Sequence, residues 1–260
     1  MTTPNRPKTG RFVWNDCLTT DVKRATAFYT ELFNWKVEQF PVGGGTYNMI
    51  KLGNEGLGGI EAQKAPGAPS AWLPYLGVEN VDAWVKQVTA AKGTVVVAPT
   101  LISKEVGRFA VVADPQGAVI AGYESAQGFN YPEPTGMPAT GTFCWYELMT
   151  TDLDGATEFY KSLTGWGSKD MDMGPMGTYR IVSRGDLDTA GLCKLQPNWG
   201  NRAYWLSYVK VDNVDESNTR ATKLGATTLV PPTDIPNVGR FAIIADPTGA
   251  PIAFFKGQQS

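Results

Sequence analysis

The chain of 260 residues contains no histidine, and this absence limits the chemistry open to it. Histidine is the most common metal ligand and the most common general acid or base in proteins. Ser-His-Asp and Cys-His catalysis are therefore excluded. A zinc or non-haem iron site is disfavoured as well, because such sites usually contain imidazole.

Cysteine, like-charge blocks and long apolar runs are also scarce. The three cysteines, Cys17, Cys144 and Cys193, are widely spaced and odd in number, which favours a reducing cytoplasm over a disulfide framework. The net charge is −2, and without a basic cluster we expect no nucleic-acid partner. Apolar runs have only strand length, and the N-terminal MTTPNRPKTG lacks an apolar core, so we expect neither a membrane partner nor a signal peptide.

The sequence contains one long segment twice. GRFVWNDCLTTDVKRATAFYTELFNW, from Gly10, matches GTFCWYELMTTDLDGATEFYKSLTGW, from Gly141. Near the end of each half, GRFAVVADPQGAVIAGYE, from Gly107, matches GRFAIIADPTGAPIAFFK, from Gly239. Matches in the same order at a similar offset indicate a tandem duplication. We therefore predict domains at 1–125 and 141–260, joined by a proline- and glycine-containing linker at 126–140.

Each half repeats a smaller pattern of one strand, one helix and three strands. In the first half a helix follows Thr20 or Asp21, either of which can cap it, and a second helix stops near Gly93. A GGG loop at 43–45 closes a hairpin, and DPQG and DPTG have the composition of type I turns. Strands are expected at Phe12–Leu18, Lys36–Phe40, Thr46–Leu52, Gly56–Ala62, Trp72–Val78, Thr94–Ala98, Arg108–Ala113 and Ala118–Glu124.

Paired βαβββ units that end in strand–DPxG–strand resemble the vicinal oxygen chelate superfamily, which includes glyoxalase I, extradiol dioxygenases and bleomycin-resistance proteins. WNDCLTTDVKRATAFYTELFNW and LGVENVDAW carry this resemblance. It extends to the two-domain, actinobacterial glyoxalase-like branch that includes 27–30 kDa antigens and is often labelled hydroxylase. The resemblance implies an α+β fold of two tandem glyoxalase-like domains, in each of which two βαβββ units form a cupped sheet.

The resemblance also implies where a metal would bind in the family's metal enzymes. Their ligands lie on the first, fifth and eighth strands of a domain. In this chain those positions hold Trp14, Leu73 and Ala121 in the first half, and Trp145, Leu206 and Ala253 in the second. Glu61 lies near a fourth-strand glutamate of glyoxalases, and its counterpart is Cys193. No metal and no other cofactor is therefore expected.

Strand alternation predicts which side chains line each cup. The central strands bring one carboxylate to each cup, Asp16 and Glu147, as the candidate catalytic residues. The predicted ligand-binding residues are Phe12, Trp14, Tyr75, Arg108, Tyr123, Phe143, Trp145, Tyr208, Arg240 and Phe255. Each has an ordinary alternative. Asp16 and Glu147 could be structural and accept hydrogen bonds from the backbone or a tyrosine. The aromatic rings could pack a closed core, and the arginines could tie their loop to the linker or pair with Asp114 and Asp246.

Two functions follow from these residues, and the sequence does not decide between them. The first is metal-independent binding of an apolar or aromatic small molecule, as in bleomycin-resistance proteins, in a Trp- and Tyr-lined cup. The second is a glyoxalase-like enzyme, a lyase, isomerase or hydroxylase-type tailoring enzyme, with Asp16 or Glu147 as general acid or base. Because the chain already pairs two domains, a monomer is expected.

Overall fold

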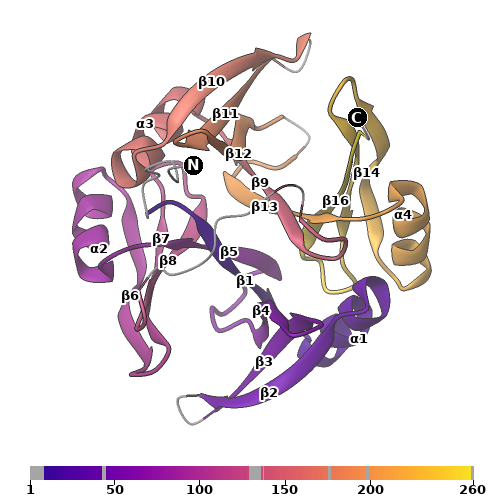
Figure 1. Ribbon diagram of the computed structural model, residues 1–260, viewed down its shortest axis with the longest axis horizontal. Helices are drawn as coiled ribbons and strands as arrows, with labels where there is room; N and C mark the ends of the chain where they lie inside the picture. Colours follow the sequence, from indigo (N-terminus) through magenta and orange to yellow (C-terminus); the bar gives the residue numbers. More distant parts are fainter. Residues whose placement is uncertain are drawn as a thin grey trace. The chain divides into compact units, whose positions relative to one another are not determined.

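A computed structural model describes residues 9–42, 45–128, 136, 138–174, 177–196 and 199–258 of the chain (Figure 1). The first half contains β1 (Phe12–Thr19), α1 (Val22–Phe33), β2 (Lys36–Val42), β3 (Gly45–Leu52), β4 (Glu55–Ala62), β5 (Ala71–Gly77), α2 (Val81–Ala90), β6 (Thr94–Ser103), β7 (Gly107–Ala113) and β8 (Val119–Ser125). The second half repeats this order with β9 (Phe143–Thr150), α3 (Leu153–Thr164), β10 (Gly167–Asp172), β11 (Thr178–Arg184), β12 (Leu187–Lys194), β13 (Tyr204–Lys210), α4 (Val214–Lys223), β14 (Thr227–Ile235), β15 (Gly239–Ala245) and β16 (Pro251–Gly257).

The strands form two eight-stranded sheets with the same topology. The strand orders are β2-β3-β4-β1-β5-β8-β7-β6 and β10-β11-β12-β9-β13-β16-β15-β14. This arrangement confirms the predicted α+β fold of paired βαβββ units. Most observed strands begin and end within two residues of the predicted bounds, but β6 continues five residues beyond the predicted Ala98. Gly43, Gly44 and most of the predicted linker lie outside the described residues.

The helix ends follow local side-chain chemistry. Asp21 caps α1 by accepting a hydrogen bond from the backbone N–H of Arg24 at 3.0 Å. Gly93 follows α2 for a different reason than predicted, because Lys92 is the residue with the left-handed φ of 66°. A Cβ on Gly93 would lie 2.7 Å from Val88 Cγ1, so close packing requires the glycine.

The DPxG segments form turns, as predicted. Asp114 Oδ1 accepts backbone hydrogen bonds from Gln116 at 2.9 Å and Ala118 at 2.8 Å. Asp246 Oδ1 accepts the equivalent bonds from Thr248 at 2.7 Å and Ala250 at 3.0 Å. Each aspartate therefore holds the turn of its own hairpin.

The chain divides into two compact units, and each takes segments from both sequence halves. Unit 1 comprises Met1–Trp14, Pro74–Pro132 and Tyr146–Trp205, and unit 2 comprises Asn15–Leu73, Glu133–Trp145 and Leu206–Ser260. Helices α2 and α3 contact one another in unit 1, as α1 and α4 do in unit 2 (Figure 1). The sequence repeat and the compact unit are therefore different divisions of the chain.

In unit 1, two consecutive buried hydrogen bonds join segments from the two sequence halves. Trp205 Nε1 donates to Tyr160 Oη at 2.9 Å, and Tyr160 Oη donates to Asp114 Oδ2 at 3.1 Å. In unit 2, Trp72 Nε1 donates to Tyr29 Oη at 2.8 Å. Burial raises the pKa of both phenols well above the usual value, so both hydroxyls keep their protons and act as donors.

The second helix of each half packs on its sheet with a different pair of side chains. In the first half Trp84, on α2, lies against Gly122, on β8, where a Cβ would come within 2.5 Å of the indole ring. At the corresponding places in the second half, α4 carries Ser217 and β16 carries the fully buried Phe254. The large side chain has moved from the helix to the strand, and the volume is filled either way.

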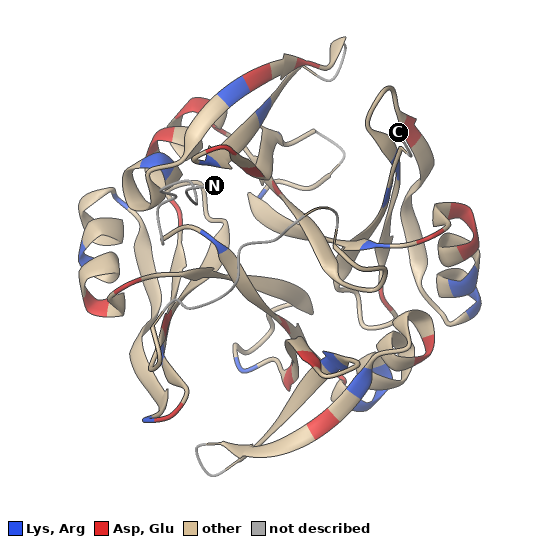
Figure 2. Cartoon of the chain, viewed as in Figure 1, with Lys and Arg blue, Asp and Glu red and all other residues tan. Residues whose placement is uncertain are grey.

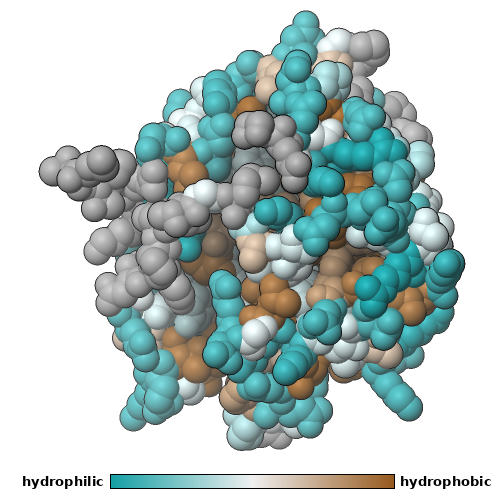
Figure 3. All heavy atoms as spheres, turned by 45° about the vertical axis from the view of Figure 1, so that its right-hand side comes forward, coloured by the Kyte–Doolittle hydropathy of each residue, from teal (hydrophilic) through white to brown (hydrophobic). Residues whose placement is uncertain are grey.

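Surface charge and hydropathy are mixed. Among the described residues, none of the helices has the length and apolar character that a membrane crossing requires. Figure 2 shows both signs of charge dispersed over the chain, and α4 has acidic residues in its first turn and basic residues in its last. On the face in Figure 3, apolar side chains form separate small patches between hydrophilic ones. The visible face therefore has no broad apolar surface.

Candidate functional site

Asp16 lies on the central strand β1 and forms a close pair with Tyr47. The Tyr47 hydroxyl donates to Asp16 Oδ1 at 2.6 Å, and the Asp16 residue is only 7% exposed. The phenol reaches the carboxylate across Gly59, which pairs with Asp16 in the parallel β1–β4 ladder. A Cβ on Gly59 would lie 2.3 Å from Tyr47 Oη. Glycine at this position is therefore what allows the phenol and the carboxylate to meet.

Glu147 occupies the corresponding position on β9, beside a glycine and a tyrosine. It pairs with Gly191 in the parallel β9–β12 ladder, and a Cβ on Gly191 would lie 1.9 Å from Tyr179 Oη. Glu147 is 8% exposed. Each compact unit therefore contains one buried candidate carboxylate beside a glycine that is covered by a tyrosine hydroxyl. The sequence analysis identified both carboxylates but neither Tyr47 nor Tyr179. The tripeptide GTY, at 45–47 and 177–179, was the available signal.

The residues that follow these carboxylates on the same face differ between the units. In unit 2, Leu18 pairs with Glu61, whose Oε1 accepts from the Asn48 backbone N–H at 3.0 Å and from Asn48 Nδ2 at 3.4 Å. In unit 1, Met149 pairs with Cys193, and the Cys193 thiol contacts Met149 Sδ at 3.1 Å. Leu18 and Glu61 in unit 2 thus correspond to two sulfur-containing side chains in unit 1.

Most of the predicted aromatic ligand-binding residues lie on inner strands of the sheets. Trp14 and Trp145 are half-buried on β1 and β9, whereas Tyr75 and Tyr208 are buried on β5 and β13. Phe255 is half-buried on β16. Tyr123, half-buried on β8, donates its hydroxyl to the backbone carbonyl of Val106 at 2.6 Å. The two indoles are therefore the largest partly exposed rings on the central strands.

Two predicted ligand-binding rings take part in aromatic clusters. In unit 1, Phe12 stacks on Tyr146 with ring centroids 3.7 Å apart. In unit 2, Phe143 lies edge-on to Trp72 at 5.3 Å and next to Trp35 at 5.7 Å. Strand alternation did not predict this packing, because the partner rings come from the other half of the sequence.

The predicted arginines are paired with carboxylates. Arg108 forms a salt bridge with Asp82 at the start of α2. Arg240 bonds to Asp215 at the start of α4, with Nε 2.8 Å from Oδ2, and to Asp234 at 2.8 Å. The partners are therefore not Asp114 and Asp246, which had been the expected alternative and which instead hold the DPxG turns. Both guanidinium groups attach a helix start to the neighbouring β-hairpin.

The residues at the family's metal-ligand positions do not fit a metal ion. Leu73, Leu206, Ala121 and Ala253 are buried and have no donor atom in their side chains. Trp14 and Trp145 offer only an indole N–H, which is a donor and cannot ligate. Among the residues that the structure describes, no three His, Cys, Asp or Glu side chains cluster so as to hold a metal. No chemical step is therefore assigned to a metal here.

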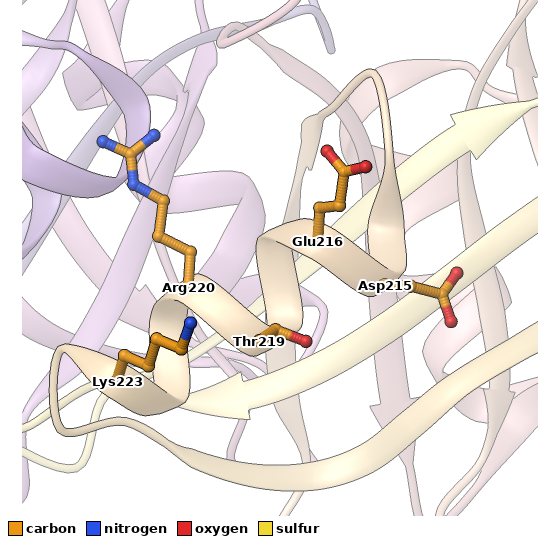
Figure 4. A pocket seen from close by; sticks show the side chains of 5 residues that line it. All are labelled: Asp215, Glu216, Thr219, Arg220 and Lys223. Carbon is orange, nitrogen blue, oxygen red and sulfur yellow. The ribbon is translucent and has the colours of Figure 1, made fainter.

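A surface hollow of about 360 Å³ lies on α4, and neither Asp16 nor Glu147 lines it (Figure 4). Its lining residues are Asp215, Glu216, Thr219, Arg220 and Lys223. It has no aromatic wall, and the Arg220 guanidinium is engaged by the backbone carbonyl and the carboxylate of Glu31. The hollow therefore has only charged and hydroxyl-bearing lining residues, and the hydrophobic and aromatic side chains that are typical of a small-molecule site are not among them.

The family is decided by a match that occurs twice. The model of the Glyoxalase/Bleomycin resistance protein/Dioxygenase superfamily matches residues 12–121 and again residues 142–254. The chain belongs to this superfamily. Solved structures of similar fold include a Mn(II)-bound glyoxalase from Novosphingobium aromaticivorans, with a TM-score of 0.64, 14% identity, and coverage of 96% of this chain and 82% of that one. For homoprotocatechuate 2,3-dioxygenase from Brevibacterium fuscum the TM-score is 0.66 at 13% identity, and the similarity covers 98% of this chain and 82% of that one.

Relatives with higher sequence identity cover nearly the whole chain. CFP32 from Mycobacterium tuberculosis, a candidate glyoxylase by name, is 35% identical over 249 residues, which cover 94% of this chain and 93% of CFP32. The anthracycline biosynthesis protein DnrV from Streptomyces peucetius is 30% identical over 257 residues, which cover 93% and 91%. The tandem arrangement of this superfamily member is thus shared with relatives of similar length.

Proposed function

We propose that this superfamily member binds an aromatic small molecule without a metal ion. The observation that carries the proposal is the chemistry of the two central strands. β1 carries Trp14 and Asp16, and β9 carries Trp145 and Glu147. The unit boundary crosses both strands, so unit 1 contains Trp14 and Glu147 and unit 2 contains Trp145 and Asp16. Each unit therefore offers a buried carboxylate and a partly exposed indole, the latter at a metal-ligand position of the metal-dependent members. An indole supplies stacking area, and a carboxylate fixes orientation by accepting hydrogen bonds.

The proposed ligand is a polycyclic aromatic molecule with polar substituents. Trp14, Tyr75 and Tyr123 are the candidate ring contacts in unit 1, and Trp145, Tyr208 and Phe255 are those in unit 2. The similarity to DnrV supports this ligand class, because that relative is named for anthracycline biosynthesis. The cytoplasm is the proposed location, in keeping with three free cysteines.

The test is a titration with a hydroxylated tetracyclic anthracyclinone, followed by quenching of tryptophan fluorescence and by calorimetry. Binding should be saturable and unchanged by EDTA or by added Mn²⁺. Replacing the indole that contacts the ligand, Trp14→Ala or Trp145→Ala, should weaken binding at least tenfold, since stacking and ring burial together exceed about 1.4 kcal/mol. Phe40→Ala is the matched control, because this ring is 38% exposed on β2. Binding that appears only with Mn²⁺ would refute the proposal.

A second candidate function is a metal-independent enzyme, and the bond between Tyr47 and Asp16 favours it. The Tyr47 hydroxyl oxygen lies 2.6 Å from Asp16 Oδ1. In such a pair the carboxylate can remove a proton from a substrate, and the phenol can stabilise the resulting oxyanion by donating a hydrogen bond to it. Such a pair suits an isomerase or a lyase, because both reactions need only proton transfer and stabilisation of an oxyanion. Asp16→Asn or Glu147→Gln would then abolish turnover and leave ligand affinity within a fewfold of the wild type. Unchanged turnover in both variants would refute an acid–base role.

A further inference from the structure

The two carboxylate–glycine–tyrosine groups share one backbone frame, so their differences can be compared position by position. Asp16 corresponds to Glu147, because each pairs with the glycine under its tyrosine. The strand that follows in sheet order is β5 beside β1 and β13 beside β9. Their first residues, Ala71 of AWLPY and Tyr204 of YWLSY, lie in unit 2 and unit 1 respectively. Ala71 therefore corresponds to Tyr204.

Tyr204 lies beside Glu147 in unit 1. The residue is half-buried at the start of β13, and β13 is next to β9 in the sheet. Burial, followed by repulsion from the Glu147 carboxylate, raises the pKa of Tyr204 to about 12, as expected for a half-buried phenol at the start of a strand that neighbours β9. Ala71, by contrast, has no atom beyond Cβ with which to fill the corresponding space beside Asp16.

The remaining side chains on this face strengthen the contrast. In unit 1 the contact between Cys193 and Met149 leaves two weakly polar sulfur atoms beside Tyr204. In unit 2 the same places hold Glu61 and Leu18. The Asp16 face thus presents two carboxylates, which accept hydrogen bonds, whereas the Glu147 face is filled by a phenol and sulfur.

We propose that the ligand occupies the Asp16 site alone, and that Ala71 and Tyr204 decide between the two sites. This inference rests on the proposed function. It further specifies the ligand as an aromatic molecule that presents hydrogen-bond donors, such as ring hydroxyls, to Asp16 and Glu61. Tyr47 is a positioning residue, because its hydroxyl fixes the Asp16 carboxylate over Gly59.

The test exchanges the two residues and counts binding sites. Calorimetry with a hydroxylated anthracyclinone should give one site per chain. Ala71→Tyr should weaken binding at least tenfold, and Ala71→Ser, which adds little volume, should keep it within twofold. Tyr204→Ala should keep the first site and add a second, weaker one. Circular dichroism and Tm establish that each variant is folded.

Two further variants separate this inference from the proposed function. Asp16→Asn and Tyr47→Phe should weaken binding and lower selectivity for the hydroxylated probe over its methyl ether, whereas Glu147→Gln and Tyr179→Phe should not. Two outcomes would overturn the inference and leave the proposed aromatic binding intact. One is the finding of two equivalent sites in the wild type. The other is a single site that is lost in Glu147→Gln and retained in Ala71→Tyr. No saturable binding by the wild type would refute the proposed function and this inference with it.

Discussion

Gly122→Ala should destabilise the protein through a single added methyl group. The new Cβ would lie 2.5 Å from Trp84 Cζ3, 2.6 Å from Cε3 and 3.0 Å from Cδ2. All three atoms belong to one rigid indole, and Trp84 is only 2% exposed. The ring cannot rotate one atom away without moving the others, so α2 must shift on the sheet.

The expected cost follows from other overpacked cores. An inserted methyl group that forces such movement destabilises by about 1–3 kcal/mol, and contact with three ring atoms places this site near the upper limit. For a chain of this size, 1 kcal/mol lowers Tm by roughly 2–4 °C. Gly122→Ala should therefore lower Tm by roughly 5–10 °C.

Differential scanning calorimetry measures this change directly. Gly45→Ala is the control, because the nearest atom to its Cβ would be Val42 O at 3.7 Å, and its Tm should stay within about 2 °C of the wild type. A double variant, Trp84→Ser with Gly122→Phe, copies the pair that the second half uses and should recover most of the stability that Trp84→Ser alone loses. An unchanged Tm in Gly122→Ala would show that the Trp84–Gly122 contact does not limit packing.

Two other outcomes follow from the charged and thiol groups. Hydrogen bonds from Arg108, Arg180 and Arg240 lower the pKa values of Asp82, Asp170 and Asp215, respectively. In the unfolded chain an aspartate has a pKa of about 3.9. The three ion pairs therefore stabilise the fold above that pH, and the stabilisation is lost as the pH falls through the lowered pKa values. Arg180→Gln should accordingly show a smaller fall in Tm between pH 5 and 3 than the wild type, and an identical fall would contradict this assignment. Burial raises the pKa of Cys144 to about 12 and raises those of Cys17 and Cys193 as well, so at pH 8 an aromatic disulfide reagent should label the native thiols far more slowly than the unfolded ones. A fast-reacting native thiol would show that one of these cysteines is accessible.

The local parts of the fold could be predicted because their causes are local. Asp21 caps α1 through a bond to a residue three positions away, and Asp114 holds a turn through bonds two and four positions away. Such interactions depend on the order of residues alone. The same holds for the strand alternation that placed Asp16 and Glu147 among the candidates.

The side-chain partners depended on contacts that sequence order does not specify. Strand alternation predicted on which face of the sheet Phe12 lies, but it could not indicate that Tyr146 stacks on it. One alternative for Arg240 was a pair with Asp246, and it pairs instead with Asp215 and Asp234. Tyr47 was missed because a tyrosine in a strand looks like ordinary packing until Gly59 is seen beneath it.

The crossed composition of the compact units has a consequence for inheritance. Trp35 donates its indole N–H to the carbonyl of Gly141 at 2.7 Å, and Trp166 donates to that of Gly10 at 3.0 Å. Exchanging one gene half with that of a relative would replace one partner in both of these bonds at once. Because each unit takes its segments from both halves, a substitution in one copy is constrained by packing partners that the other copy supplies.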